Sequence, residues 1–156
     1  DEHIEVMRTL WSQEKPEFNG RFTRFSGIQS RPLPIQRPHP PIHVGGMSPA
    51  AHRRAVARGN GWYGFFQDLD ATRLALAGLE EAAKENERPA ALGKLEISIT
   101  PPGPVDRDTA KRFEDLGVDR LILMRGMTDM VGLGSDESRD GVFTFIEETA
   151  RQFDLG

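Results

Sequence analysis

A glycine pair followed by a helix-starting serine is the stretch of this 156-residue chain best suited to bind a ligand. Residues 42–44 form a short apolar strand, which Gly45 and Gly46 interrupt, and Ser48 and Pro49 are residue types that begin helices. A helix start after a glycine turn presents free N–H groups and a positive dipole end, and the absent Cβ atoms let an anion approach closely. We therefore expect a phosphorylated ligand at Gly45, Gly46, Met47 and Ser48; the alternative is a tight strand-to-helix turn without a ligand.

The histidines do not have the spacing of a metal site. His39 and His43 are separated by prolines and the start of a strand, and His52 belongs to the following helix. No carboxylate pair lies nearby at a ligand-like spacing, so we assign no metal. His43 alternates with apolar neighbours and should face the opposite side of the sheet from them, as a packing or pocket-wall residue.

Arg125 is the best cationic candidate, because it directly follows the last predicted strand. It could bind a substrate or coenzyme anion, or it could pair with a carboxylate such as Asp129. Arg53, Arg54 and Arg58 lie on the helix after the glycine pair, where we expect mostly a solvated face. No Ser-His-Asp or Cys-His arrangement is present, so nothing supports hydrolysis by a nucleophile.

Four aromatic residues occur together in the second predicted strand. They could line a pocket for a ring, but aromatic residues in strands usually belong to the core, and we favour the core. The residues are Trp62, Tyr63, Phe65 and Phe66.

Strands and helices alternate along most of the chain. The sequence begins with an amphipathic helix at 2–12, a small Asn-Gly hairpin or an extended flap at 18–25, and a proline-rich extended segment at 30–41. After these, the pattern predicts four strands and four helices. The strands are expected at 42–44, 61–66, 95–100 and 118–124. The helices are expected after Ser48 to about 58, from Asp70 to about 87, at 106–116 and at 142–153, the last following a glycine-rich irregular stretch at 126–141.

This alternation predicts an α/β fold with a parallel sheet. We expect a single domain, in which residues 1–40 form a helix plus an extended flap and residues 41–156 form four β/α units. Periodicity alone fits a small doubly wound sheet about as well as part of a barrel. In both architectures ligands bind at the carboxyl ends of the strands, here 45–48, 65–68, 100–102 and 124–128.

Composition excludes several partners. The net charge is −4 and the basic residues are scattered, so nucleic acid is not expected. The chain has no cysteine, and no apolar run approaches the roughly 20 residues that span a membrane. We expect a cytoplasmic protein.

Residues 31–46, 48–55 and 59–62 together resemble the signature run of the luciferase-like monooxygenase superfamily, most closely its branch that uses the deazaflavin coenzyme F420. The resemblance extends over essentially the whole chain, but only to the C-terminal half of the family's (β/α)₈ barrel. A complete barrel takes about 250 residues, and the chain begins without Met, so we expect a cut or processed boundary.

The resemblance implies an oxidoreductase that transfers hydride between F420, or alternatively FMN, and a small organic substrate. It places the coenzyme phosphate at residues 45–48, and it leaves the catalytic residues unassigned because much of that apparatus comes from the absent strands. The competing hypothesis is a non-enzymatic half-barrel, a fragment or assembly module. Its two open edges and apolar inner face would require a second copy of the chain or the missing N-terminal half.

Overall fold

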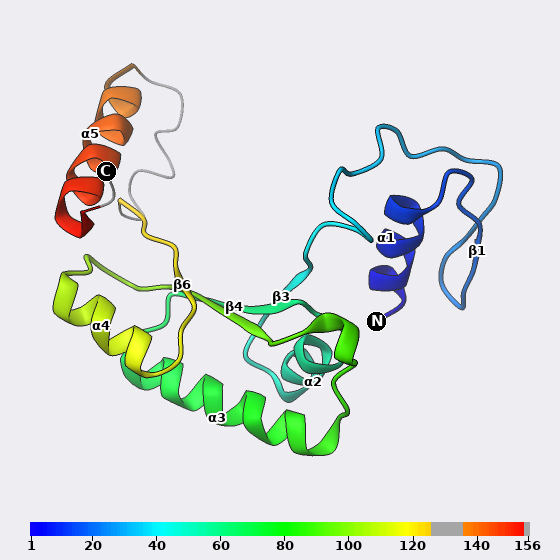
Figure 1. Cartoon of the computed structure of the whole chain (residues 1–156), viewed down its shortest axis with the longest axis horizontal. Helices are drawn as coiled ribbons and strands as arrows, with labels where there is room; N and C mark the ends of the chain where they lie inside the picture. The colour runs from blue at the N-terminus through cyan, green and yellow to red at the C-terminus, as the bar shows by residue number, and fades with distance from the viewer. Residues whose placement is uncertain (126–135, 155–156) are drawn as a thin grey trace.

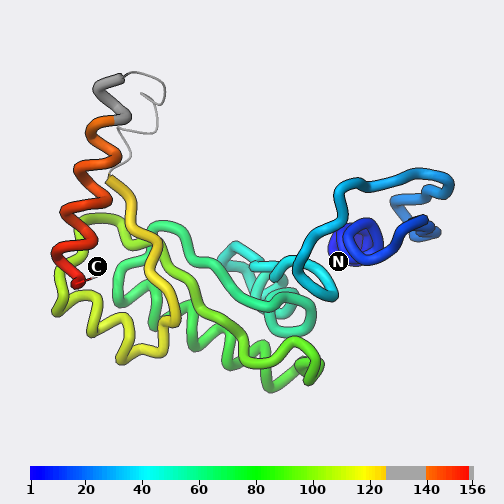
Figure 2. The backbone as a smooth tube through the Cα atoms, turned by 45° about the horizontal axis from the view of Figure 1, so that its top comes forward, coloured from blue at the N-terminus to red at the C-terminus, as the bar shows by residue number. Residues whose placement is uncertain are grey.

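The computed structural model describes residues 1–125 and 136–154, and of residues 136–139 it describes the backbone only. A parallel sheet with helices on one side occupies the centre, and α1 (Glu2–Ser12) and α5 (Asp136–Phe153) lie at opposite ends (Figure 1). The two termini are correspondingly far apart (Figure 2). No helix in the described ranges combines the length and apolar character that crossing a membrane requires.

The sheet contains the four predicted strands in sequence order. They are β3 (His43–Gly45), β4 (Gly61–Phe65), β5 (Glu96–Thr100) and β6 (Arg120–Leu121). Neighbouring strands are parallel, with Val44 opposite Trp62 and Trp62 opposite Ile97. The predicted α/β class with a parallel sheet is therefore confirmed. The order has no reversal of the kind found in a doubly wound sheet.

Three helices cover one face of this sheet: α2 (Pro49–Arg58), α3 (Leu69–Glu85) and α4 (Arg107–Asp115) (Figure 1). Ser48 caps α2 as predicted. The prediction that Asp70 caps α3 is wrong, because Asp68 has the extended backbone of an N-cap and its Oδ1 accepts the Ala71 N–H at 2.8 Å. Asp70 is the second residue of the helix, within its first turn, where it pairs with Arg73.

Two predicted boundaries at the C-terminal end also need correction. The fourth strand, expected at 118–124, has only two residues in β6, because it lies at the sheet edge and only Arg120 and Leu121 pair with β5. The final helix begins at Asp136 instead of residue 142, so the predicted irregular stretch at 126–141 is helical from 136 onward; residues 126–135 lie outside the described ranges. A short 3₁₀ helix, η1 (Ala90–Leu92), was not predicted.

The apolar core lies between the sheet and its helices. Alternation along each strand sends every second side chain toward the helices, and those side chains are apolar and buried. The opposite face carries mainly polar side chains, with Phe65 as an exposed aromatic residue at the end of β4, so the expected uniformly apolar inner face is wrong. The buried core residues include Ile42, Val44, Val56, Trp62, Ala75, Leu79, Ile97, Ile99 and Phe113.

His52 is a polar member of this core. It is 5% exposed on α2, and its ring packs in a T-shaped arrangement with the Trp62 indole at a centroid distance of 5.8 Å. Its Nε2 has no hydrogen-bond partner in the described structure. Gly78 of α3 lies directly against the ring, since a Cβ there would be 2.6 Å from His52 Nδ1. Burial lowers the pKa of His52, and a hydrogen bond with the Gly78 backbone only partly offsets this effect.

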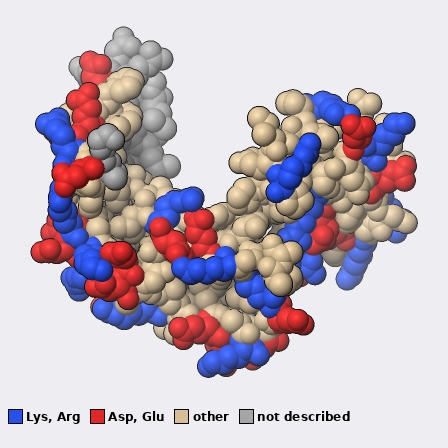
Figure 3. Space-filling model, in the orientation of Figure 1, with Lys and Arg blue, Asp and Glu red and all other residues tan. Residues whose placement is uncertain are grey.

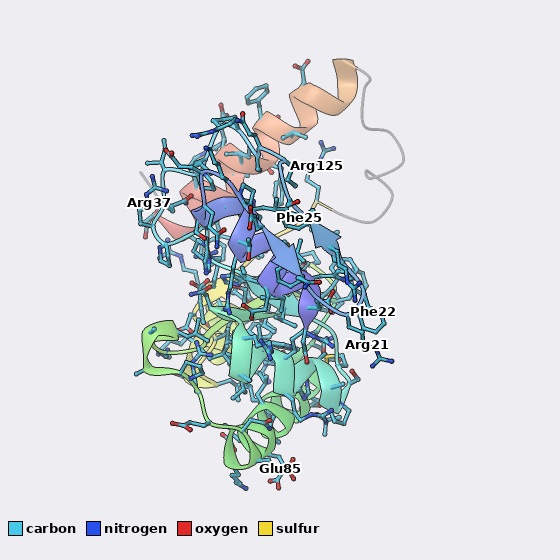
Figure 4. The ribbon with its side chains drawn as sticks, turned by 90° about the vertical axis from the view of Figure 1, so that its right-hand side faces the viewer. Arg21, Phe22, Phe25, Arg37, Glu85 and Arg125 are labelled. Carbon is cyan, nitrogen blue, oxygen red and sulfur yellow. The ribbon has the colours of Figure 1, made fainter. Side chains whose placement is uncertain are left out.

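The predicted N-terminal hairpin is present as β1 (Phe18–Asn19) paired antiparallel with β2 (Arg24–Phe25). A single carboxylate fastens it to α1. Glu2 accepts the backbone N–H groups of three consecutive residues at 2.7–2.9 Å, namely Arg21, Phe22 and Thr23. Figure 4 labels Arg21 and Phe22 in this part of the chain. Desolvation opposes ionisation, but these hydrogen bonds outweigh it and lower the pKa of Glu2.

Ion pairs join α1 to α2. Asp1 contacts Arg54 at 2.9 Å and Glu5 contacts Arg58 at 2.7 Å, whereas Arg53 is exposed. Of the three arginines expected on a solvated face, two therefore hold the N-terminal helix in place.

Arg88 fixes the other end of α2. Its guanidinium donates to the carbonyl oxygens of Val56 and Gly59 at 2.8 and 2.9 Å, and also to those of Leu92 and Gly93. A cation at a helix C-terminus satisfies free carbonyl groups and complements the helix dipole.

The Glu2 contacts generate a first prediction. Replacing Glu2 by Gln should loosen the hairpin tip, because a neutral amide accepts these three hydrogen bonds less strongly than a carboxylate. Amide hydrogen exchange at residues 21–23 should accelerate, while exchange in β4 stays unchanged. Because the folded pKa of Glu2 is lowered, protection in the wild type should persist at pH values where a free glutamate is already half protonated. Unchanged exchange in Glu2→Gln would contradict this role.

A second prediction concerns His52. Its pKa is lowered in the folded state, so the unfolded chain binds more protons and stability must fall as the pH drops below about 6.5 and through the folded pKa. In His52→Gln, the difference in urea midpoint between about pH 7 and pH 5 should shrink. His3→Gln, at an exposed position of α1, is the matched control and should keep the wild-type difference. Equal pH dependence in all three proteins would rule out this contribution.

Candidate functional site

The glycine pair forms the turn between β3 and α2. Gly45 is the last residue of the strand, and Gly46 has φ +110°, a left-handed conformation that L side chains rarely adopt. A Cβ on Gly46 would also lie 3.1 Å from the Cβ of Ala51. Residues 45–50 are exposed. A substitution at Gly46 would therefore reorient the peptide planes at the helix start.

The start of α2 leaves several N–H groups available. The Ser48 side chain and carbonyl accept the Ala51 N–H, at 3.2 and 2.9 Å, and the carbonyl also accepts from His52. Pro49 has no N–H. The N–H groups of Met47, Ser48 and Ala50 have no protein acceptor in the described structure, and the first turn of α2 contains no acidic residue. These groups can bind an anion.

A tryptophan side chain of the neighbouring strand β4 binds the glycine turn from the helix-covered side of the sheet. Trp62 of β4 is fully buried, and its indole N–H donates to the carbonyl oxygen of Gly46 at 2.9 Å. Sequence reasoning treated Trp62 as a core residue, which is confirmed, but it missed this hydrogen bond.

The same prediction is wrong for two other aromatic residues. Phe65 and Phe66 are 46% and 41% exposed, because alternation places Phe65 on the open face and Phe66 lies just beyond the strand. Their ring centroids are 5.3 Å apart. Phe66 also has a positive φ of 58°, a strained conformation for a bulky residue. The end of β4, next to the glycine turn, thus presents an exposed aromatic pair.

The end of β5 completes this edge of the sheet. Thr100 is buried, its Oγ1 lies 2.8 Å from the Tyr63 hydroxyl, and its carbonyl accepts the Gln67 N–H at 3.0 Å. These contacts fix the aromatic strand against its neighbour. No sequence pattern indicated them, because they join residues far apart in the chain.

Arg125 follows β6 as predicted, with an exposed side chain against α5, where a Cβ on Gly141 would be 2.5 Å from its Nη2 (Figure 4). Its proposed partner Asp129, and residues 126–128 of the predicted ligand edge, lie outside the described ranges. The structure therefore leaves the choice between an anion site and an ion pair at Arg125 untested.

A charged cluster lies on the open face near the start of the strands. Glu96 Oε1 is 3.0 Å from Arg120 Nη2, 3.2 Å from Ser98 Oγ and 3.9 Å from His43 Nε2. His43 thus faces away from the helices, as predicted. Lys or Arg and Asp or Glu side chains are visible at the bottom of the hollow that separates the α1 end of the molecule from the α5 end (Figure 3). Sequence reasoning missed this cluster, although period-two alternation already places its members on one face.

The histidines do not come together. His39 lies near Trp11, with ring centroids 6.3 Å apart, His43 lies beside Glu96, and His52 is in the core. Among residues 1–125 and 136–154, no group of three or more histidines and carboxylates is arranged to hold a metal ion.

Comparison with protein families and curated proteins gives consistent matches. A family profile described as luciferase-like monooxygenase matches residues 1–152. An uncharacterised protein of Mycobacterium tuberculosis is 28% identical over 152 residues, which cover 96% of this chain and 48% of that protein. The FMNH₂-dependent dimethylsulfone monooxygenase of Pseudomonas putida is 41% identical over 63 residues, covering 40% of this chain and 17% of that enzyme. The chain spans less than half the length of these relatives.

Two solved structures resemble this fold. An F420-dependent secondary alcohol dehydrogenase, solved with an F420–acetone adduct, gives a TM-score of 0.57 at 17% identity over 78% of this chain and 54% of that one. The monooxygenase RslO1 from Streptomyces bottropensis gives 0.51 at 26% identity over 75% of this chain and 36% of that one.

Proposed function

This chain belongs to the luciferase-like monooxygenase family, and from that premise we propose that it forms the C-terminal half of an oxidoreductase barrel and binds the phosphate of a flavin-type coenzyme. The residues that bind it are Gly45, Gly46, Met47 and Ser48. A bound coenzyme of this type would supply hydride transfer to or from a small organic substrate.

The sheet topology supports the half-barrel. Strands of a (β/α)₈ barrel follow one another in sequence order with all helices outside, and β3 to β6 have this order with α2, α3 and α4 on one face. The chain also spans less than half of its relatives, so additional strands would be available in a longer protein. We therefore propose that the polar face carrying Glu96 and Arg120 is the interior of the barrel.

One observation carries the phosphate site: three N–H groups at the start of α2, those of Met47, Ser48 and Ala50, have no protein acceptor in the described structure. Gly46 adds no Cβ next to them, and no carboxylate in the first turn would repel an anion. Ligands of parallel α/β folds bind at this edge of the sheet. Phe65 and Phe66 add an exposed aromatic surface there, suited to a planar ring.

For the coenzyme we propose F420, with FMN as the alternative. A solved structure of similar fold is described as F420-dependent and a sequence relative as FMNH₂-dependent, and a phosphate site alone does not distinguish the two coenzymes. Arg125 is the second candidate for a coenzyme or substrate anion. We propose binding roles for these residues and assign no catalytic acid or base.

The phosphate site predicts that Gly46→Val weakens binding of FMN by the 156-residue chain at least about tenfold, because a β-branched residue cannot keep φ +110°. Binding is measured by titration calorimetry with FMN, F420 and riboflavin, which has the ring but no phosphate. The matched control is Gly103→Val, at an exposed glycine with open space around it.

The expected pattern is a loss for FMN and F420 in Gly46→Val alone, with riboflavin binding equal in all proteins. Equal FMN affinity in Gly46→Val and Gly103→Val would refute the phosphate site. A higher wild-type affinity for F420 or for FMN decides between the two coenzymes.

The second candidate function is a non-enzymatic assembly module, and exposed apolar side chains favour it. On α5, Phe143 and Ile146 are 65% and 54% exposed. The C-terminal end of α5 is held by Arg107, which donates to Gln152 O, and by Gln152, which donates to Val105 O. Covering apolar area stabilises an assembly by roughly 25 cal/mol per Å².

We therefore predict that the isolated chain forms a dimer or larger assembly, since a symmetric partner covers the same surface on both copies. Light scattering over a concentration series is the measurement. Ile146→Asp should shift the chain toward the monomer, whereas Thr144→Asp, at an exposed position of the same helix, should not. A soluble monomer at high concentration with a cooperative unfolding transition would contradict this prediction. Assembly without coenzyme binding would favour the module over the enzyme.

A further inference from the structure

The hydrogen bond between Trp62 and Gly46 has a geometric consequence for the phosphate turn. In a trans peptide the carbonyl of one residue and the N–H of the next point in opposite directions. The peptide bond between Gly46 and Met47 is trans, since the cis bonds of the described chain both precede prolines in the extended segment. Because the Gly46 carbonyl points at the indole, the Met47 N–H points away from it.

The indole lies on the helix side of the sheet, packed against His52 of α2. The Met47 N–H is thereby directed away from the core, toward the exposed surface of the turn. Without the indole donor, the Gly46 carbonyl would need a hydrogen bond from water. Because glycine is conformationally permissive, the Gly46–Met47 peptide plane could then rotate and turn the Met47 N–H elsewhere.

The indole itself cannot shift easily. Trp62 is fully buried, and a Cβ on Gly64 would lie 2.6 Å from its Cη2, so its ring fills the space over that residue. His52 of α2 packs against the indole in a T-shaped arrangement, and Gly78 lies directly against the His52 ring. A rigid donor of this kind can hold a flexible glycine peptide in one orientation.

We infer that Trp62 is a positioning residue, whose indole N–H holds the Gly46 peptide so that the Met47 N–H faces the coenzyme phosphate. The inference rests on the proposed phosphate site and deepens it. This hydrogen bond explains how a glycine turn, whose backbone can adopt many conformations, is preorganised for an anion. Trp62 itself does not contact the ligand.

The test is Trp62→Phe, which keeps an aromatic ring in the core and removes only the donor and part of the indole. Inorganic phosphate is titrated into the ¹⁵N-labelled 156-residue chain, and the amide signals of Met47, Ser48 and Ala50 are followed. Wild type should show phosphate-dependent shifts at these amides. In Trp62→Phe the affinity should fall about fivefold, the effect of one neutral hydrogen bond, and the shift of the Met47 amide should decrease most.

The matched control is Trp11→Phe, which changes the only other tryptophan of the sequence, in α1. This variant should bind phosphate like wild type. Free of ligand, the Trp62 indole N–H should exchange slowly with solvent, and the Met47 amide should exchange fast.

The outcomes separate this inference from the proposed function. Phosphate binding that is equal in Trp62→Phe and Trp11→Phe overturns the positioning role and leaves the phosphate site intact. An absence of phosphate-dependent shifts in folded wild type overturns both. If Trp62→Phe does not fold, rapid exchange of the indole N–H in wild type overturns the positioning role, and slow exchange together with a shifted Met47 amide supports it.

Discussion

The alternation of side chains along the parallel strands is the constraint from which the rest of this structure follows. One set of strand residues, including Val44, Trp62 and Ile97, packs against the helices and supplies the apolar core. The other set must then occupy the open face, where Glu96 and Arg120 pair. The chain therefore completes a core between the sheet and its helices, while the second face carries mainly polar side chains and the exposed Phe65.

The same alternation places the candidate site. Strand ends gather at one edge, so the turn at Gly46 lies beside the exposed Phe65 and Phe66 at the end of the next strand. A residue that belongs to the core by its burial, Trp62, reaches the turn because β3 and β4 are adjacent and in register. One indole here both fills the core and binds the Gly46 carbonyl, and for that reason the buried layer and the exposed turn cannot vary independently.

Local chemistry was sufficient to predict much of this from sequence. Ser48 and Pro49 identify the start of α2, and the period-two pattern of residues 95–100 identifies β5, because capping and alternation act within a few residues. The resemblance of residues 31–46, 48–55 and 59–62 to the luciferase-like family predicted the family that the profile match shows. The predictions that were wrong, and the contacts that were not predicted, depend on the arrangement of the whole sheet. Asp68 and Asp70 are equally good caps by type, and only the backbone conformation after β4 decides between them. The exposure of Phe65 and the Glu96 cluster depend on which strand face the helices cover, which a single strand pattern does not reveal.

The two ends of α2 are satisfied in different ways. At the C-terminal end, Arg88 binds the last carbonyl groups permanently, as part of the folded chain. At the N-terminal end, Ser48 accepts the Ala51 N–H. The preceding N–H groups of Met47, Ser48 and Ala50 have no protein acceptor in the described structure and can bind water or a ligand. A ligand that binds only the folded helix start adds stability that grows with its free concentration. If the proposed coenzyme binds there, its concentration would control local opening of the first turn of α2, while opening at the Arg88 end would not change with ligand.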